Sequence, residues 1–191
     1  MNKKKIVVFA SGSGTNAENI VEYSRKHGSF EVVKIYCNKT QAGVIGRGYS
    51  LHVPVVVFDK ELFYSTSRIV DDIKNEGADA VVLAGFLWLI PDNMLESFGG
   101  RIINIHPALL PKHGGKGMYG AKVHEAVHAN RDKETGITIH HVNEVYDEGK
   151  TIFQASCPVT NEDTPETIAA KVHKLEYEHF PRVIAEFVNS L

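Results

Sequence analysis

The stretch Lys5-Ile-Val-Val-Phe-Ala-Ser-Gly-Ser-Gly-Thr-Asn16 decides the fold class. Its apolar part, up to Ala10, is rich in β-branched residues and is typical of a strand buried on both faces. A glycine-rich turn follows, and the mixed polar and apolar residues up to His27 have the pattern of a helix. The stretch therefore predicts a strand, a glycine-rich turn and a helix in that order.

The same pattern recurs through the first half of the chain. Apolar runs alternate with segments of helical size, and turn-forming residues separate them. Strands are predicted at residues 32–36, 53–58, 80–84 and 102–106, and helices at 42–50, at 60–75 and from about Pro91. Such regular alternation favours a parallel sheet with helices on both faces.

The second half is less regular. A helix is predicted at 121–130, and the strands predicted at 135–142 and 151–156 should form an antiparallel pair at one edge, because only a loop joins them. The last helix should begin near Asp163, and Pro181 should kink or interrupt it. The predicted fold is therefore α/β and Rossmann-like, with a mostly parallel twisted sheet of about seven strands, helices on both faces and an antiparallel edge.

Length and composition limit the class of protein. A chain of 191 residues suits one domain with a full hydrophobic core. The 21 basic and 23 acidic residues nearly balance, which argues against nucleic acid as a partner. Cys37 and Cys157 lack the spacing of a zinc or redox pair, and no apolar run reaches the roughly 18 residues of a membrane span. We expect a cytoplasmic protein with no membrane partner, either a monomer or a weak homodimer.

Two polar residues interrupt the predicted strand at 102–106. Its three isoleucines suit a buried strand, whereas Asn104 and His106 would be buried at a cost unless they are used. They are two residues apart, so they point the same way in an extended chain. One interpretation is structural, with a turn asparagine and a hydrogen-bonded core histidine. The other is a site, because ligands bind beyond the carboxyl ends of parallel strands.

The segment Gly12-Ser-Gly-Thr-Asn-Ala17 matches the dinucleotide fingerprint G-x-G-x-x-G/A. The match is incomplete, because Cys37-Asn-Lys39 stands where an acidic residue would bind the ribose hydroxyls. A tight turn without a ligand is one alternative. A single phosphate fits better, since the free N–H groups and dipole of a helix N-terminus favour an anion.

Several histidines form weaker patterns. His124-Glu-Ala-Val-His128 matches the zinc-hydrolase motif, but no third ligand is evident, so we interpret it as a half-exposed amphipathic helix and expect no metal. His140 and His141 should lie on opposite faces of a strand, so at most one of them faces a site. Asp147, in the loop after that strand, could approach His106 and hold its ring or raise its pKa.

Five segments occur in an order that carries a family resemblance. They are Ser11-Gly-Ser-Gly-Thr-Asn16, Leu83-Ala-Gly-Phe86, Asn104-Ile-His-Pro-Ala-Leu-Leu-Pro111, Asp147-Glu-Gly149 and Lys171-Val-His-Lys-Leu-Glu176. Together they resemble the phosphoribosylglycinamide formyltransferases, which belong to the wider folate-dependent formyltransferase family. The resemblance covers essentially the whole chain.

The resemblance implies a role for each matching position. Residues 1–191 would form a single formyltransferase domain, with a phosphate- and ribonucleotide-binding half at about 1–100 and a catalytic and folate-binding half at about 101–191. The catalytic residues would be Asn104, His106 and Asp147. Glycinamide ribonucleotide would be bound by Gly14, Thr15, Asn16, His173 and Glu176. The co-substrate 10-formyltetrahydrofolate would be bound by Leu87, Trp88, Leu89, Ile90, Asn104, Asn143, Glu144, Val145, Tyr146 and Asp147.

The implied reaction, in purine biosynthesis, needs these residue types. Attack of an amine on a formyl carbon creates an oxyanion, for which Asn104 and a protonated His106 can be donors. Asp147, through His106 or a water, can carry the proton. Two alternatives remain, a formyltetrahydrofolate hydrolase and a nucleotide-binding module without chemistry. Trp88 stands where some members carry an arginine near the folate tail, and Lys60 and Arg68 are nearby in the sequence.

Overall fold

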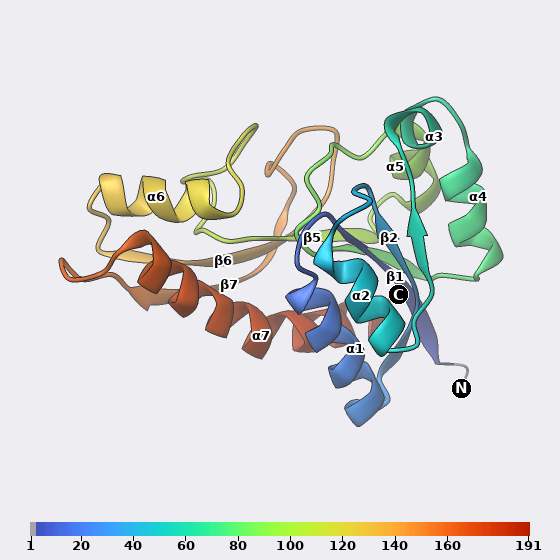
Figure 1. Ribbon diagram of the computed structural model, residues 1–191, viewed down its shortest axis with the longest axis horizontal. Coiled ribbons are helices and arrows are strands. Elements are labelled where there is room, and N and C mark those ends of the chain that lie inside the picture. The colour runs from blue at the N-terminus through green and yellow to red at the C-terminus, as the bar shows by residue number, and fades with distance from the viewer. Residues whose placement is uncertain (1–2) are drawn as a thin grey trace.

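A single seven-stranded sheet runs through the protein, as a computed structural model that describes residues 3–191 shows (Figure 1). Its strand order is β3-β2-β1-β4-β5-β6-β7. The first five strands in this order are parallel, whereas β6 is antiparallel to both β5 and β7. The strands are β1 (Lys4–Ala10), β2 (Phe30–Cys37), β3 (Val55–Val57), β4 (Ala80–Leu83), β5 (Ile102–His106), β6 (Glu134–His141) and β7 (Thr151–Pro158). The predicted fold class, including its antiparallel edge, is confirmed.

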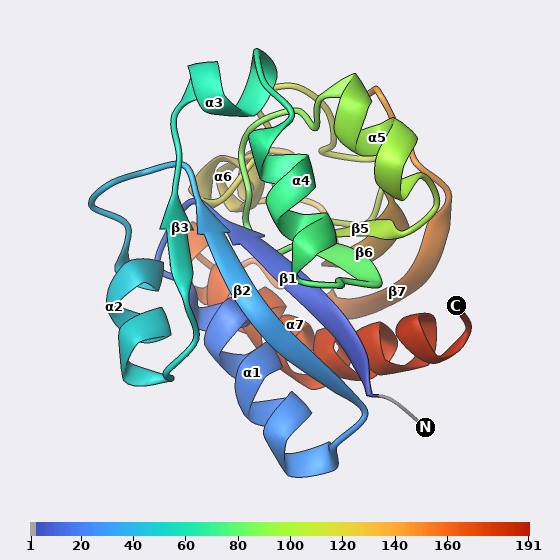
Figure 2. The same cartoon turned by 90° about the vertical axis from the view of Figure 1, so that its right-hand side faces the viewer.

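Helices cover both faces of this sheet (Figure 2). Helices α1, α2, α6 and α7 contribute to one apolar core and α3, α4 and α5 to the other. The helices are α1 (Thr15–His27), α2 (Gly43–Ser50), α3 (Lys60–Tyr64), α4 (Arg68–Asn75), α5 (Asp92–Phe98), α6 (Ala121–Ala129) and α7 (Pro165–Asn189). Strand β5 serves both cores, because Ile103 and Ile105 pack on the side of α7 and Ile102 on the opposite side.

The helix predicted at 60–75 is wrong in one respect, because the segment forms two helices. The Asp59 carboxylate accepts a hydrogen bond from the Leu62 N–H and so caps α3. The break at residues 65–67 is polar: the Thr66 hydroxyl donates to the Leu62 carbonyl, and the Ser67 hydroxyl donates to Asp71. Side-chain hydroxyls of this kind compete with the backbone bonds of a continuous helix.

Helix α7 continues through Pro181, so of the two predicted effects, a kink or an interruption, the interruption is wrong. Proline has no N–H group and leaves the carbonyl four residues earlier, that of Tyr177, without its helical partner. The side chain of Asn19 on α1 supplies the missing donor, because its Nδ2 lies 2.9 Å from that oxygen. Packing against α1 therefore offsets part of the cost of a proline within the helix.

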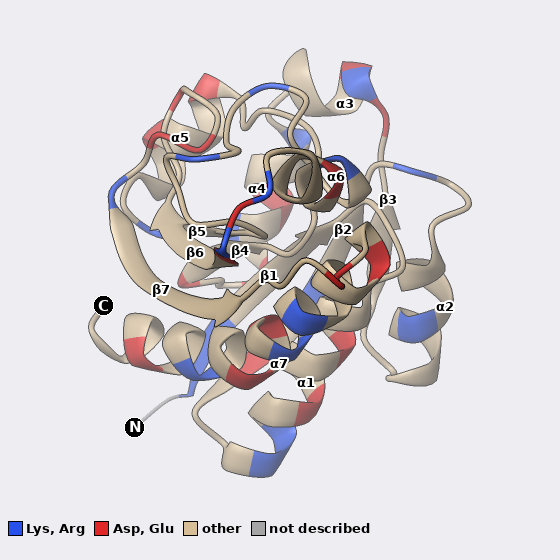
Figure 3. Ribbon diagram, turned by 90° about the vertical axis from the view of Figure 1, so that its left-hand side faces the viewer, with Lys and Arg blue, Asp and Glu red and all other residues tan. Residues whose placement is uncertain are grey.

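The surface carries charges of both signs. Basic and acidic residues are interleaved along α1 and α7 (Figure 3). Within residues 3–191, no helix combines the length and the apolar character that crossing a membrane would require.

Candidate active site

A cavity of about 510 Å³ opens at the carboxyl ends of β1, β4 and β5. Its walls come from segments that are distant in the sequence and are brought together by the parallel strands. Three of these segments follow strands of the parallel part of the sheet: the glycine turn after β1 (residues 12–16), the segment after β4 (83–90) and the end of β5 (104–107). The others are the turn before α6 (115–120), the loop after β6 (142–147 without 144) and one side of α7 (His173 and Glu176). The cavity lies beyond the carboxyl ends of parallel strands, where the sequence placed the expected site.

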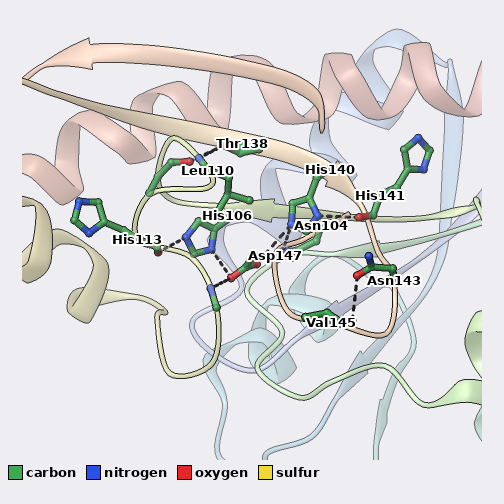
Figure 4. Close-up of polar contacts among 12 residues, drawn as sticks. Asn104, His106, Leu110, His113, Thr138, His140, His141, Asn143, Val145 and Asp147 are labelled. Atoms are coloured by element: carbon green, nitrogen blue, oxygen red, sulfur yellow. Dashed lines mark hydrogen bonds and ion pairs between the residues drawn. The ribbon is translucent and has the colours of Figure 1, made fainter. Parts of the chain in front are cut away.

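The polar centre of this cavity joins His106, at the end of β5, to Asp147, in the loop after β6 (Figure 4). His106 Nδ1 lies 3.4 Å from Asp147 Oδ2. The other ring nitrogen, Nε2, lies 2.8 Å from the carbonyl oxygen of His113. A carbonyl oxygen can only accept, so His106 donates its Nε2–H to it and Nδ1 is left to face the carboxylate. In the neutral ring, Nδ1 therefore carries the basic lone pair.

Asn104 is held by a second histidine. Its Nδ2 lies 3.0 Å from His140 Nε2, while His140 Nδ1 lies 2.8 Å from the His141 carbonyl oxygen. Because Nδ1 must donate to that oxygen, Nε2 of the neutral ring accepts from Asn104. One N–H of the Asn104 amide is thus occupied, and the second remains for a ligand. His140 lines the cavity and His141 does not, as the strand alternation predicted.

Burial and neighbouring charges set the protonation of this centre. Burial lowers the pKa of His106, and the nearby Asp147 charge offsets this only in part. Burial also raises the pKa of Asp147, but interactions with His140, His106 and the Gly115 N–H outweigh it and hold that pKa below its usual value. The prediction that Asp147 approaches His106 is confirmed. A neutral histidine beside an ionised carboxylate is able to accept a proton.

The backbone of the loop after β6 explains how Asp147 reaches this place. Asp147 has φ of 60°, in the left-handed region that aspartate tolerates better than most residues. Two residues later, a Cβ atom on Gly149 would lie 1.6 Å from the His141 carbonyl oxygen. Only glycine allows this close approach, and the Gly115 N–H then bonds Asp147 Oδ2 at 2.9 Å.

The glycine turn ends at the N-terminus of α1. Gly14 has φ of 79°, and a Cβ there would lie 2.6 Å from Val44, so the turn requires glycine. The Asn16 side chain donates to Glu176 Oε2 at 2.9 Å, and His173 Nδ1 lies 2.9 Å from the same oxygen. The bond to Glu176 raises the pKa of His173. The free N–H groups of the α1 terminus and the Glu176 carboxylate therefore line one part of the cavity.

An apolar wall faces the polar groups. Leu87, Trp88, Leu89 and Ile90 all line the cavity, and the Tyr64 hydroxyl donates to the Leu89 carbonyl at 3.0 Å. Trp88 packs against the rings of Phe58, Phe63, Tyr64 and Phe86, and Lys60 Nζ lies 5.8 Å from its centroid.

The loop after β6 supplies Asn143, Val145, Tyr146 and Asp147 to the cavity lining. Glu144, which the sequence placed with them, is exposed and does not line the cavity. Of the residues that the sequence assigned to the two substrates, Glu144 alone lies outside the cavity lining.

The interpretation of His124-Glu-Ala-Val-His128 as part of a half-exposed amphipathic helix is confirmed, because α6 buries Val123, His124 and Val127 and exposes the opposite side. His124 is 3% exposed and lines the cavity, whereas His128 is exposed. Burial lowers the pKa of His124, and His173 adds to the effect. No group of three potential metal ligands occurs among residues 3–191. The sequence missed His124 as a cavity residue, although its position on the apolar side of α6 was a usable signal.

Comparisons with known proteins agree with this geometry. The sequence pattern of the family described as formyl transferase matches residues 4–184. The chain is 42% identical over 189 residues to the chloroplastic phosphoribosylglycinamide formyltransferase of Arabidopsis thaliana, covering 95% of this chain but only 64% of that relative. It is 35% identical over 190 residues to phosphoribosylglycinamide formyltransferase of Bacillus subtilis, covering 97% of this chain and 95% of the relative.

Solved structures show the same relationship. The crystal structure of phosphoribosylglycinamide formyltransferase from Bacillus halodurans superimposes with a TM-score of 0.86 at 35% identity, covering 97% of this chain and 95% of that one. The family pattern spans both the glycine turn and the residues of the polar centre. The chain therefore belongs to the formyl transferase family.

Proposed function

We propose that the protein transfers the formyl group of 10-formyltetrahydrofolate to the amine of glycinamide ribonucleotide, a step of purine biosynthesis. The observation that carries this proposal is a single cavity that joins an anion-binding glycine turn, a polar centre able to accept a proton and an apolar wall. The relatives from Arabidopsis thaliana and Bacillus subtilis, both named phosphoribosylglycinamide formyltransferase, support it.

The part of the cavity at α1 suits the ribonucleotide. The N–H groups of Gly14, Thr15 and Asn16 would bind its phosphate, because a helix N-terminus combines free donors with a favourable dipole. Glu176 would accept hydrogen bonds from the ribose hydroxyls, and His173 would hold that carboxylate. The Oε2 atom of Glu176 already accepts from both Asn16 and His173, which orients the carboxylate before a substrate arrives.

The apolar wall suits the folate. Its ring system is flat and needs both an apolar surface and polar groups at its edge, which Leu87 to Ile90 and the loop from Asn143 to Asp147 would supply. Lys60, whose Nζ lies 5.8 Å from the ring of the lining residue Trp88, would be the cation that faces the carboxylates of the tail. Glu144 is left out of this set because it does not line the cavity.

The reaction forms a bond between the substrate amine and the formyl carbon and breaks the bond from that carbon to the folate nitrogen. One proton must leave the amine and one must reach the departing nitrogen. The free N–H of Asn104 would donate to the oxyanion, and one such donor is typically worth about 10²–10³ in rate. The Nε2–H of His106 is taken by the His113 carbonyl and Nδ1 carries a lone pair, so the neutral ring serves in this conformation as a proton acceptor rather than as an oxyanion donor.

His106 Nδ1 and Asp147 Oδ2 are two acceptors at 3.4 Å when the histidine is neutral. A proton taken from the amine, directly or through a water, would be shared between them and so remove their mutual repulsion. It would then pass to the folate nitrogen as that nitrogen departs. General acid-base catalysis of this kind contributes about 10²–10⁴ in rate.

One assay tests the proposal. The protein is mixed with 10-formyltetrahydrofolate, with and without glycinamide ribonucleotide, and both deformylated folate and formylated ribonucleotide are measured. We expect both products in equal amounts and only when the ribonucleotide is present. Folate release without the ribonucleotide would indicate a hydrolase, and the absence of turnover under both conditions would indicate a binding module.

A further inference from the structure

The tight turn after β5 touches both members of the proton-accepting pair. The carbonyl oxygen of His113 accepts the Nε2–H of His106 at 2.8 Å, and the N–H of Gly115 donates to Asp147 Oδ2 at 2.9 Å (Figure 4). Each contact uses a backbone atom of the turn. The position of the turn therefore decides which nitrogen of His106 carries the proton and where Asp147 lies.

The side chain of His113 ties this turn to the segment that follows α6. Its backbone has φ of 56°, a left-handed conformation that is uncommon for residues other than glycine, although histidine, asparagine and aspartate adopt it more often than the rest. Its ring Nε2 lies 2.6 Å from Asp132 Oδ2, in the segment between α6 and β6. These side chains are only 8% and 9% exposed. A short, buried bond of this kind opposes relaxation of the turn.

Asp132 is an ionised and well-anchored partner for the His113 ring. Burial raises the pKa of Asp132, but bonds with Lys112 and His113 outweigh it and hold that pKa below its usual value. Asp132 lies two residues before the start of β6 at Glu134, and β6 pairs with β5 through His106 and Thr138. The carboxylate is therefore tied to the same sheet that carries His106.

We propose that His113 and Asp132 are positioning residues for the transfer reaction: their buried contact holds the turn so that the His113 carbonyl keeps His106 in the Nε2–H form, with Nδ1 free to take the proton. Neither His113 nor Asp132 lines the cavity, so neither is placed to touch a substrate bound there. This inference rests on the proposed function only for its kinetic consequence, because the proton position on His106 is a property of the protein without substrates.

The first test is therefore made on the free protein. Two-bond proton–nitrogen correlation NMR of the histidine side chains distinguishes a protonated ring nitrogen from an unprotonated one. At a pH where His106 is neutral, we expect Nε2 to be protonated and Nδ1 not. In His113→Phe, which keeps the ring volume but loses the bond, and in Asp132→Ala, the two nitrogen shifts of His106 should move toward each other as both tautomers become populated.

Lys112→Ala is the matched control. Lys112 contacts the same Asp132 carboxylate, but its side chain is 61% exposed and lies outside the path to His106. This substitution should leave the His106 nitrogen shifts unchanged. If Asp132→Ala does not fold, His113→Phe decides the question by itself. A far-UV circular dichroism spectrum that matches the wild type establishes that a variant is folded.

The second test is kinetic and uses the formyl transfer assay. A misplaced reaction centre commonly costs about 10–100-fold in rate. We expect His113→Phe and Asp132→Ala to lower kcat by this factor while the KM values of both substrates stay within about threefold, because the contacts that bind substrates are unchanged. When either change is added to His106→Ala, no further loss should follow, since the group being positioned is already absent.

Two results would overturn the proposal. One is a wild-type spectrum with Nδ1 protonated, or His106 shifts that do not change in His113→Phe and Asp132→Ala. The other is a loss of rate in the double variant His106→Ala, His113→Phe that equals the two single losses combined, which would indicate general damage to the fold. A protein without transfer activity would contradict the proposed function, but the NMR test of the positioning contact would still stand.

Discussion

The Nδ1 atom of His106 lies 3.4 Å from Oδ2 of Asp147, although one residue ends β5 and the other follows β6. The antiparallel pairing of β5 with β6 brings the two together, and it pairs Asn104 with His140 in the same register. The fold thus places an amide, two histidines and a carboxylate within one polar cluster at the base of the cavity. The predictions below test what each part of the cavity does.

His106→Ala should lower kcat by at least about a hundredfold, because it removes the proton acceptor. It should cost about 1–3 kcal/mol of unfolding free energy, since the His113 carbonyl loses its donor. Steady-state kinetics and urea unfolding measure the two effects. The control is His128→Ala, an exposed histidine on α6, which should match the wild type in both. Near-normal turnover in His106→Ala would contradict the assignment.

The pH dependence of kcat/KM should have an acid limb centred below 6.5, the ordinary value for histidine, because burial lowers the pKa of His106 and the neutral ring is the active form. In Asp147→Asn the rate should fall by about 10²–10⁴. Its acid limb should also move to lower pH, because the Asp147 charge raises the pKa of His106. Titration of the substrate amine is the same in both proteins, so the difference isolates His106. If the acid limb of Asp147→Asn moved to higher pH, the assignment of that limb to His106 would be refuted.

Glu176→Gln should weaken binding of the ribonucleotide, because the charged acceptor shared by Asn16 and His173 becomes neutral. Loss of a charge-assisted bond corresponds to a rise in KM of about tenfold or more. The KM of the folate should not change. In NMR titration, the pKa of His173 should fall below its wild-type value, because the bond to Glu176 raises it. Glu178→Gln, an exposed change on the same helix, is the control.

Gly149→Ala should lower the unfolding free energy by at least about 2 kcal/mol and disturb Asp147, because its Cβ would lie 1.6 Å from a backbone oxygen. Gly46→Ala is the control, and it should raise the unfolding free energy instead of lowering it. A Cβ at Gly46 in α2 meets nothing within 4 Å, so the higher helix propensity of alanine should stabilise the protein by up to about 1 kcal/mol. Equal effects of the two substitutions in urea unfolding would contradict this account.

The sequence predicted the order of strands and helices, because those signals are local. The apolar run before Gly12, the isoleucines around Asn104 and the proline after His106 each mark an element or its end without reference to distant residues. The polar residues Asn104 and His106 were detectable for the same reason, since a strand that is otherwise apolar makes a buried amide and imidazole conspicuous.

Contacts between distant segments were not predictable in this way. The continuity of α7 through Pro181 depends on Asn19 of α1, and the burial of His124 depends on how α6 packs on α7. The exposed position of Glu144 is set by the path of a loop whose backbone the sequence does not specify. In each of these cases, the deciding partner lies on another element.

Asn104, His106 and the glycine turn were therefore detectable from the sequence alone, because two polar groups conflict with an apolar strand and the turn requires glycine. Only the tertiary structure decided which nitrogen of His106 faces Asp147, that His140 and not His141 joins Asn104, and that His113 contacts Asp132. The physical reason is that each of these is a hydrogen-bond direction between side chains or carbonyl groups of different segments, and such directions exist only after the sheet has brought the segments together.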